Sequence, residues 1–463
     1  MRLSDDALLK IFRYYLDASP RSWPRLVHVC CKWRRVVFMS QQALHLRLFC
    51  SSGTPVSKTL YCWPPLPIVL DYGGSLALDP PAPEDEVNII AALALSDRIS
   101  SINLTVTTSL LKKLCAVERP FLELDDLTLL SRDSVPLDLP SSFRWGPRLR
   151  RLHLNRIASP ALFQLLHYSK NLVDLRLHES LNSWYFSIEE LTDALLGTPQ
   201  LRSLSLHFPS TTDHVSPSPP PCRRIFFPVL TRLSFRGPSK YLERLVLRVD
   251  SPRLRDILVT LFTDKSVIDL SRLGDFLDRI VMHKSHPQAC IQYSERAMSI
   301  SLTQPGTSRF KLRLLSNLFS ERPYAKPCII GFSAFLLNVE DLRISTTQAS
   351  SQENSFYNER WPELFNSLTG VRWLHLDVNN ATNVVRSLQD MFPALYKLYL
   401  PHPGPHHAPL SEAIARFTTS RWRSGHPIGV EYEHICRLGE LHGRGASLCI
   451  VPLHYYVLIF LSQ

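Results

Sequence analysis

One short stretch of the chain gathers side chains that could bind a metal ion. His402, His406 and His407 lie within the sequence PHPGPHHAP, and imidazole nitrogens are common ligands of zinc and other transition metals. The stretch contains no Asp, Glu or Cys to complete a site, and its prolines are typical of a solvated loop. We therefore expect no bound metal and no cofactor.

The sequence lacks the familiar motifs of nucleotide binding and catalysis. It contains no Gly-x-Gly-x-x-Gly, P-loop, His-Glu-x-x-His or Gly-x-Ser-x-Gly. Its ten cysteines are scattered without a Cys-x-x-Cys spacing, so they are expected to act mostly as small apolar side chains. We expect a protein that is not an enzyme.

Composition limits the partners further. The 463 residues carry a formal net charge of +11, but Lys and Arg are spread along the chain, with at most two adjacent, and form no dense basic block, which argues against a nucleic-acid partner. The most apolar run, at 455–461, is too short to cross a membrane. No basic leader precedes Asp5 and Asp6, so we expect an intracellular protein of the cytoplasm and/or nucleus, with no membrane partner.

A six-residue pattern, apolar-x-x-apolar-x-apolar, recurs along the chain and predicts the elements that position any functional side chain. Successive copies up to Leu254 start 23 to 29 residues apart, which is the period of leucine-rich repeats. The copies start at Ile99, Leu124, Leu149, Leu172, Leu201, Leu230, Leu254, Val339, Val371 and Leu395, with a weaker copy at Ala297. Leu44 and Pro67 begin earlier, imperfect copies. The irregular region 262–338 contains either the single copy at Ala297 or two degenerate repeats.

Each copy predicts a short strand, and the segments between copies predict helices. A proline lies two positions before the first leucine in five copies, where it ends the preceding helix. In one helical segment Ser187 is placed as the N-cap and Gly197 as the C-cap. Stacked units give an α/β solenoid with parallel strands on its concave face and helices on its convex face. An ordinary α/β domain of successive strand-helix units is the alternative.

The first forty residues differ from the repeats. Ser4 is positioned to cap a helix that begins with Asp5 and Asp6, which are favourable near the positive end of the helix dipole. A second helix is predicted from Trp23 and Pro24 to Val37. Two short helices cannot form an independent core, so we expect them to pack on the repeats, on another protein, or on both.

The stretch LSDDALLKIF…WPRLVHVCCKWRRVVF resembles an F-box, with Ser4 where that motif usually has proline and with no residues upstream of the motif. An F-box followed by such repeats resembles the fungal F-box proteins with C-terminal leucine-rich repeats. The resemblance implies an F-box that binds the Skp adaptor, and through it a cullin ubiquitin ligase. Phe12 and Trp33 are expected to be the main anchors. The adaptor-binding residues implied are Leu3, Leu8, Leu9, Ile11, Phe12, Leu26, Val29, Cys30, Trp33, Arg34 and Val37.

The resemblance also implies that the repeats hold an unknown target protein for ubiquitination. The x positions beside the central leucine of each copy project from the concave sheet. The target-binding residues expected there are Arg151, His153, Arg176, Arg343, Trp373, His375, Lys397 and Tyr399. Covering of the last four by the C-terminal segment is the alternative.

The predicted organisation is an F-box at 1–50, a linker with the first imperfect repeats at 51–98, a solenoid at 99–402 and a C-terminal cap or tail at 403–463. The leading interpretation is a substrate-recognition subunit of a Skp-cullin-F-box ubiquitin ligase. The alternative is a protein-interaction scaffold whose divergent F-box does not join a ligase.

Overall fold

The computed structural model divides the chain into two compact units. Unit 1 comprises Met1–Pro209 and Phe227–Leu230, and unit 2 comprises Ser210–Phe226 and Thr231–Gln463. The structure describes residues 3–52, 56–73, 83–117, 119–131, 133, 137–138, 147–158, 162–178, 188–208, 224–263, 267–280, 288–294, 297–304, 308–316, 328–330, 338–346, 368–377, 385, 392–401 and 408–433.

Unit 1 begins with the predicted helices. Helix α1 (Asp5–Ala18) starts as expected, because Ser4 Oγ accepts a hydrogen bond from the Ala7 N–H at 3.3 Å. The second predicted helix is two helices, α2 (Trp23–Val27) and α3 (Cys31–Met39), separated by an extended Cys30. A short 3₁₀ turn, η1 (Pro20–Ser22), joins α1 to α2.

The rest of unit 1 is a parallel sheet with helices between its strands. Its strands, in spatial order, are β1 (Leu48–Ser51), β2 (Ile68–Tyr72), β3 (Ile99–Val106), β4 (Asp126–Ser131), β6 (Arg151–Asn155), β8 (Asp174–His178) and β9 (Ser203–His207). The connections contain α4 (Val56–Cys62), α5 (Pro83–Leu93), η2 (Ser96–Arg98), α6 (Thr108–Cys115), α7 (Leu162–Tyr168) and α8 (Ile188–Leu195). A small separate pair joins β5 (Leu137–Asp138) and β7 (Ile157–Ala158).

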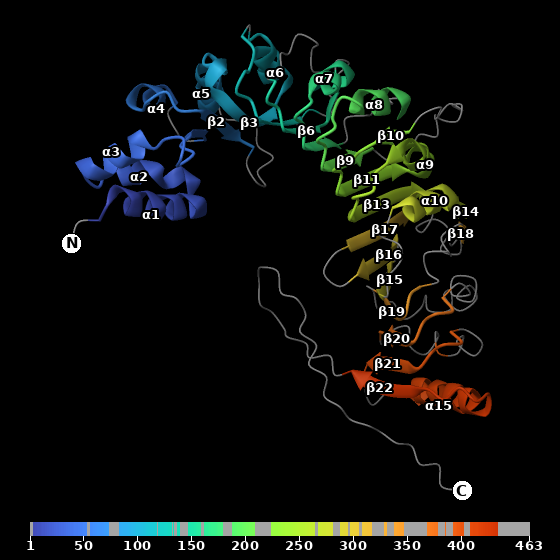
Figure 1. Ribbon diagram of the computed structural model, residues 1–463. Helices are drawn as coiled ribbons and strands as arrows, with labels where there is room; N and C mark the ends of the chain where they lie inside the picture. Colours follow the sequence, from blue (N-terminus) through green and yellow to red (C-terminus); the bar gives the residue numbers. More distant parts are fainter. Residues whose placement is uncertain are drawn as a thin grey trace. The chain divides into compact units, whose positions relative to one another are not determined.

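The register of these strands explains the repeat. Leu127, Leu152, Leu175 and Leu204 are directly opposite one another in successive parallel pairs, and all are buried. The alternate residues on the same strands are partly or fully exposed, apart from the buried Ser205. In Figure 1 helices α5 to α8 lie on one side of the strands. Because the leucines are buried and the alternate residues are more exposed, the leucines face these helices and the opposite face of the strands is open. Each repeat therefore buries its leucines against its neighbours, which is the principle of a solenoid.

Unit 2 contains a second run of strands. In spatial order these are β11 (Arg232–Pro238), β13 (Asp256–Thr263), β17 (Ser308–Ser316), β16 (Ala297–Gln304), β15 (Gln288–Ser294), β19 (Asp341–Thr346), β20 (Trp373–Leu376), β21 (Lys397–Pro401) and β22 (Gly429–Glu433). Helices α9 (Ser239–Arg248), α10 (Ser271–Arg279) and α15 (Ala408–Arg423) connect them. Short pairs join β10 (Ile225–Phe226) to β12 (Val249–Asp250), and β14 (Val267–Asp269) to β18 (Cys328–Ile330).

The irregular region forms neither kind of repeat that the sequence suggested. Strand β16, which contains the weak copy at Ala297, runs antiparallel to both β15 and β17. Strand β17 pairs in parallel with β13, and β15 pairs in parallel with β19. The region is therefore a three-stranded meander inserted into a parallel sheet. Its middle strand satisfies the apolar pattern because alternation does not depend on strand direction.

Two remaining predictions concern the ends of elements. Gly197 was expected as a C-cap, but its φ is not positive. A Cβ at this position would lie 2.5 Å from the His167 backbone oxygen, so glycine here allows the turn after α8 to approach the end of α7. Ser187 lies outside the described residues. No helix in the described ranges combines the length and apolar character that a membrane crossing requires.

Candidate protein-binding surfaces

The N-terminal module has a small apolar core of its own. Leu8, Phe12 and Leu16 line the inner face of α1 and are buried. The Phe12 and Trp33 rings meet edge to face with centroids 4.8 Å apart, which joins α1 to α3. At the start of both helices, Lys32 Nζ donates to the Leu3 carbonyl oxygen at 2.6 Å. The module is therefore held at both its apolar centre and its polar edge.

A second apolar stripe on α1 is not covered by the described part of the chain. Ala7, Ile11 and Tyr14 follow the three- and four-residue spacing of one helix face. Ile11 is 49% exposed, and Tyr14 is more exposed still. Leu3 continues the stripe beyond the N-terminus of α1 and is also exposed. Exposed apolar residues in a row are typical of a protein-binding surface.

The structure divides the residues expected to bind the adaptor into buried, half-buried and exposed groups. Phe12 is 0% exposed, so the expectation that it anchors a partner is corrected: it belongs to the module's core. Trp33 and Leu9 are half-buried. The buried members are Leu8, Phe12, Leu26 and Val37, and the exposed members are Leu3, Ile11, Val29, Cys30 and Arg34. Val29 and Cys30 are exposed because the chain leaves the helix between α2 and α3.

Trp23 fixes the module to the first strands of unit 1. Its indole Nε1–H donates to the Arg47 carbonyl oxygen at 2.8 Å. Its ring also packs edge to face on Trp63, with centroids 4.8 Å apart. Because Arg47 immediately precedes β1 and Trp63 follows α4, the module and the first repeat share one set of contacts.

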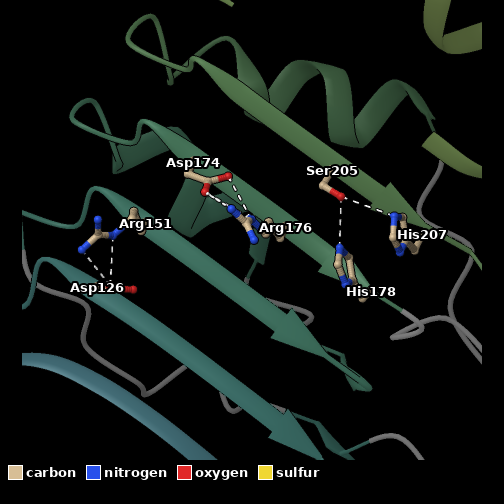
Figure 2. Close-up of polar contacts among 7 residues, drawn as sticks. All are labelled: Asp126, Arg151, Asp174, Arg176, His178, Ser205 and His207. Atoms are coloured by element: carbon tan, nitrogen blue, oxygen red, sulfur yellow. Dashed lines mark hydrogen bonds and ion pairs between the residues drawn. The ribbon is translucent and has the colours of Figure 1, made fainter. Parts of the chain in front are cut away.

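The open face of unit 1 carries a ladder of polar side chains (Figure 2). Arg151 of β6 pairs with Asp126 of β4 at 2.9 Å, and Arg176 pairs with Asp174 on its own strand at 2.8 Å. Burial raises the pKa of Asp126, while Arg151 acts against that rise. Two of the three arginines predicted to bind a target, Arg151 and Arg176, are thus already paired with carboxylates.

Three histidines extend this ladder, and two of them were not among the predicted residues. His178 and His207 are directly opposite in the β8–β9 pair, and Ser205 Oγ lies 3.0 Å from His178 Nε2 (Figure 2). His153 meets the His178 ring edge to face at 4.9 Å. Burial lowers the pKa of His153 and, with the neighbouring histidines adding to the effect, that of His178 to about 3. His153 and His178 are therefore uncharged at neutral pH.

In unit 2 the structure brings together four of the predicted target-binding residues. Trp373 lies opposite Lys397, and His375 lies opposite Tyr399 in the β20–β21 register. The His375 and Tyr399 rings stack with centroids 4.2 Å apart. His375 Nε2 lies 3.3 Å from Asp341 Oδ1.

The positive charge of Lys397 is balanced by a carboxylate in the same cluster. It pairs with Glu431 of β22, and its Nζ lies 5.0 Å from the centre of the Tyr399 ring. Its hydrogen bond to Glu431 is the main reason that the pKa of Lys397 is raised, so the ammonium group stays charged. The C-terminal segment expected as an alternative cover, from 434 onward, lies outside the described residues.

Sequence reasoning missed the basic residues of the meander. Lys311 and Arg313 project from the open face of β17 and are exposed, as is Arg343, the remaining predicted target-binding residue, on β19. Their signal is the alternation in RFKLRLL, which predicts a half-buried strand. It was missed because this segment does not follow the hexad pattern. His402, His406 and His407 lie outside the described residues, and no cluster within the described ranges has the ligands for a metal ion.

The repeated strand-and-helix unit, its buried leucines in register and its open strand face define a leucine-rich-repeat fold. No known protein family matches the chain, and no curated protein matches it. Among solved structures it is similar to the leucine-rich repeat-containing protein LegL7 from Legionella pneumophila. The two are 14% identical with a TM-score of 0.26, over 81% of this chain and 98% of that chain.

Proposed function

We propose that the chain is a non-catalytic substrate receptor of a Skp-cullin-F-box ubiquitin ligase. In this proposal the N-terminal module binds the Skp adaptor and the open strand faces hold a target protein. The supporting observation is the exposed apolar stripe on α1, which contains Ile11, with Leu3 beside it and Val29 on the loop before α3. These are residues of the F-box-like pattern that the module does not use for its own packing.

The attachment of the module suits that role. Because Trp23 joins the module to Arg47 and Trp63, a partner bound to α1 is held at a fixed place relative to the first strands. Ubiquitin transfer by such a receptor depends on raising the local concentration of target lysines near the conjugating enzyme. A rigid connection favours this more than a flexible linker does.

Capture of a purified Skp adaptor by the intact chain tests the proposal. The variant carries Ile11→Asp and Val29→Asp, which place charge on the exposed positions and leave the buried core unchanged. The control is Leu122→Asp, because Leu122 is 50% exposed and lies far from the module in sequence. We expect the intact chain and the control to capture the adaptor and the double variant to lose capture by at least about tenfold.

Thermal unfolding of all three proteins establishes that the variants stay folded. If the folded intact chain does not capture the adaptor, or if the folded double variant captures it as well as the control does, the receptor proposal is wrong. The scaffold interpretation, in which the module only packs on the first repeat, then replaces it.

A further inference from the structure

We propose that the open face of the meander in unit 2 binds an extended acidic peptide segment of the target, with acidic side chains four positions apart. This inference rests on the proposed role of the repeats as a target-binding surface and names the chemistry of that target. The surface, called the basic strip below, consists of Lys311, Arg313, Arg343 and the polar side chains between them, Ser301, Ser299, Cys290 and Gln292.

The strand pairings place these side chains in two rows. In the first row Lys311 of β17 faces Ser301 of β16, Ser301 faces Cys290 of β15, and Cys290 faces Arg343 of β19. In the second row the order is Arg313, Ser299, Gln292 and Ser345. Figure 1 shows β17, β16, β15 and β19 as consecutive strands. Cations therefore stand on the two outer strands and uncharged side chains on the two inner ones.

The positive charge of the basic strip is not balanced within the described part of the chain. Arg232 pairs with Asp256 and Lys397 with Glu431, and His375 Nε2 lies 3.3 Å from Asp341 Oδ1, so the nearby carboxylates of this face already have partners outside the strip. Lys311, Arg313 and Arg343 form no ion pair with any residue in the described ranges. The two rows between β17 and β19 contain no carboxylate.

The thiol at the centre of the strip does not supply the missing negative charge. Burial raises the pKa of Cys290, although Arg343 and Lys311 both act to lower it. Cys290 thus stays neutral at physiological pH.

The uncharged side chains of the basic strip offer hydrogen bonds between the cations. Ser299 Oγ donates to Gln292 Oε1 at 3.4 Å, which leaves the donating end of the Gln292 amide available to an acceptor. Ser301 Oγ donates to the Cys290 carbonyl oxygen at 3.3 Å. The side chains of Ser299, Ser301 and Cys290 are small, so an extended backbone can approach the sheet closely between the flanking cations.

The spacing of the cations determines the ligand. Neighbouring strands are about 4.8 Å apart, so Lys311 and Arg343, three strand spacings apart, have backbones separated by about 14 Å. In an extended peptide, side chains four positions apart point to the same side and are separated by about 13 Å. An Asp or Glu at each of these positions would reach one cation each. Arg313 adds a second donor beside Lys311.

A short peptide fits this face better than a nucleic acid does. A nucleic acid carries negative charge along its whole length. The row that holds Lys311 and Arg343 continues into Leu258 on β13 and His375 on β20, so no Lys or Arg extends it on either side. A segment with two acidic side chains and neutral flanks therefore matches this row better than a continuous phosphate backbone does.

Fluorescence anisotropy with purified full-length protein and labelled peptides tests this inference. The probes are decapeptides of Ser and Gly carrying Glu-x-x-x-Glu, Glu-x-Glu or Gln-x-x-x-Gln, and a single-stranded oligonucleotide of similar length. We expect the Glu-x-x-x-Glu peptide to bind most tightly, and its affinity to fall as salt is raised.

The variant is Lys311→Gln with Arg343→Gln, and the matched control is Arg253→Gln with Arg423→Gln. The control removes the same charge from exposed positions of unit 2 outside the strip. We expect the strip variant to lose affinity for Glu-x-x-x-Glu by about tenfold, and the control to lose less than about twofold. Both variants remove exposed charges, and circular dichroism verifies that both stay folded.

Three outcomes overturn the inference: equal binding of Glu-x-Glu and Glu-x-x-x-Glu, equal losses in variant and control, or tighter binding of the oligonucleotide through the same two residues. Because this assay contains no adaptor, its failure is distinct from failure of the receptor proposal. A chain that captures the adaptor but shows any of these outcomes keeps the proposed function and loses only this ligand.

Discussion

The imidazole rings of His178 and His207 lie face to face, with centroids 3.9 Å apart and planes 8° apart. The parallel pairing of β8 with β9 sets this contact, because it places the two residues directly opposite each other. Two charged imidazolium rings at this distance repel strongly, so the stack is stable only while at least one ring is neutral.

The histidine stack predicts a loss of stability in mild acid. The folded-state pKa of His178 is lowered to about 3 from an ordinary value of 6.5. Between these two pH values the unfolded chain is protonated at His178 and the folded chain is not. His178 therefore contributes stability above the unfolded-state pKa, and that contribution is lost as the pH falls from 6.5 toward 3. We expect the melting temperature to drop between about pH 7 and about pH 5, and to drop less in His178→Gln. The exposed His426→Gln is the control and should behave like the parent. An equal drop in all three proteins contradicts this account.

Gly197 predicts a steric cost at the packing of α7 and α8. A Cβ there would lie 2.5 Å from the oxygen and 2.6 Å from the Cα of His167, both of them backbone atoms that cannot rotate away. We expect Gly197→Ala to reduce the free energy of unfolding by ~1–3 kcal/mol, measured by urea denaturation. Gly429→Ala is the control, since the nearest atom to its added Cβ is 3.7 Å away. Similar stabilities for the two variants would show that the turn after α8 relaxes freely.

Trp23 predicts how firmly the N-terminal module is attached. The residue is 2% exposed, and its Nε1–H is the donor to the Arg47 carbonyl oxygen. Trp23→Phe keeps most of the ring but leaves that oxygen without its donor, which we expect to cost ~1–3 kcal/mol in urea denaturation followed by circular dichroism. Trp422→Phe, at a position 73% exposed, should change stability by less than ~0.5 kcal/mol. If Trp23→Phe is as stable as Trp422→Phe, the indole hydrogen bond does not hold the module in place.

The sequence pattern predicts most of the strands because a repeat imposes the same demand many times. Every regular copy from Ile99 to Leu254, and those at Val339, Val371 and Leu395, coincides with a parallel strand in the described residues. The imperfect copy that starts at Pro67 coincides with β2, and the one that starts at Leu44 ends where β1 begins. Each strand needs buried leucines at fixed positions, so the pattern is strong even where single copies vary.

The features that the pattern cannot predict depend on contacts between distant segments. The direction of β16 is set by hairpin partners on both sides, and apolar alternation is the same in either direction. The break between α2 and α3 interrupts an apolar spacing that a continuous helix would also satisfy. Gly197 resembles a helix cap in sequence, yet its role depends on the backbone of His167, thirty residues away.

The sequence predicts which residues of the candidate site lie on the open face, but it does not predict how their charges pair. Counting from the central leucine places Arg151, His153, Arg176 and Trp373 on the open face, as the structure has them. The counting says nothing of which charges cancel: Arg151 pairs with Asp126 on the neighbouring strand, and Arg176 pairs with Asp174 on its own strand. Lys311 and Arg313 lie outside the hexads, so counting did not reach them.

The meander also gives unit 2 one pairing between strands that are close in sequence and one between strands that are distant, and this difference affects the order of folding. Strands β15 and β16 meet at Ser294 and Ala297, so their pairing closes a very short loop, whereas Asp256 of β13 meets Arg309 of β17 only after a long stretch of chain has been brought together. Loop closure costs less entropy for the short connection, and local pairings form earlier than distant ones. We expect the meander to be a local folding nucleus on which β19 and the strands after it add in turn, with the join to β13 the slow step.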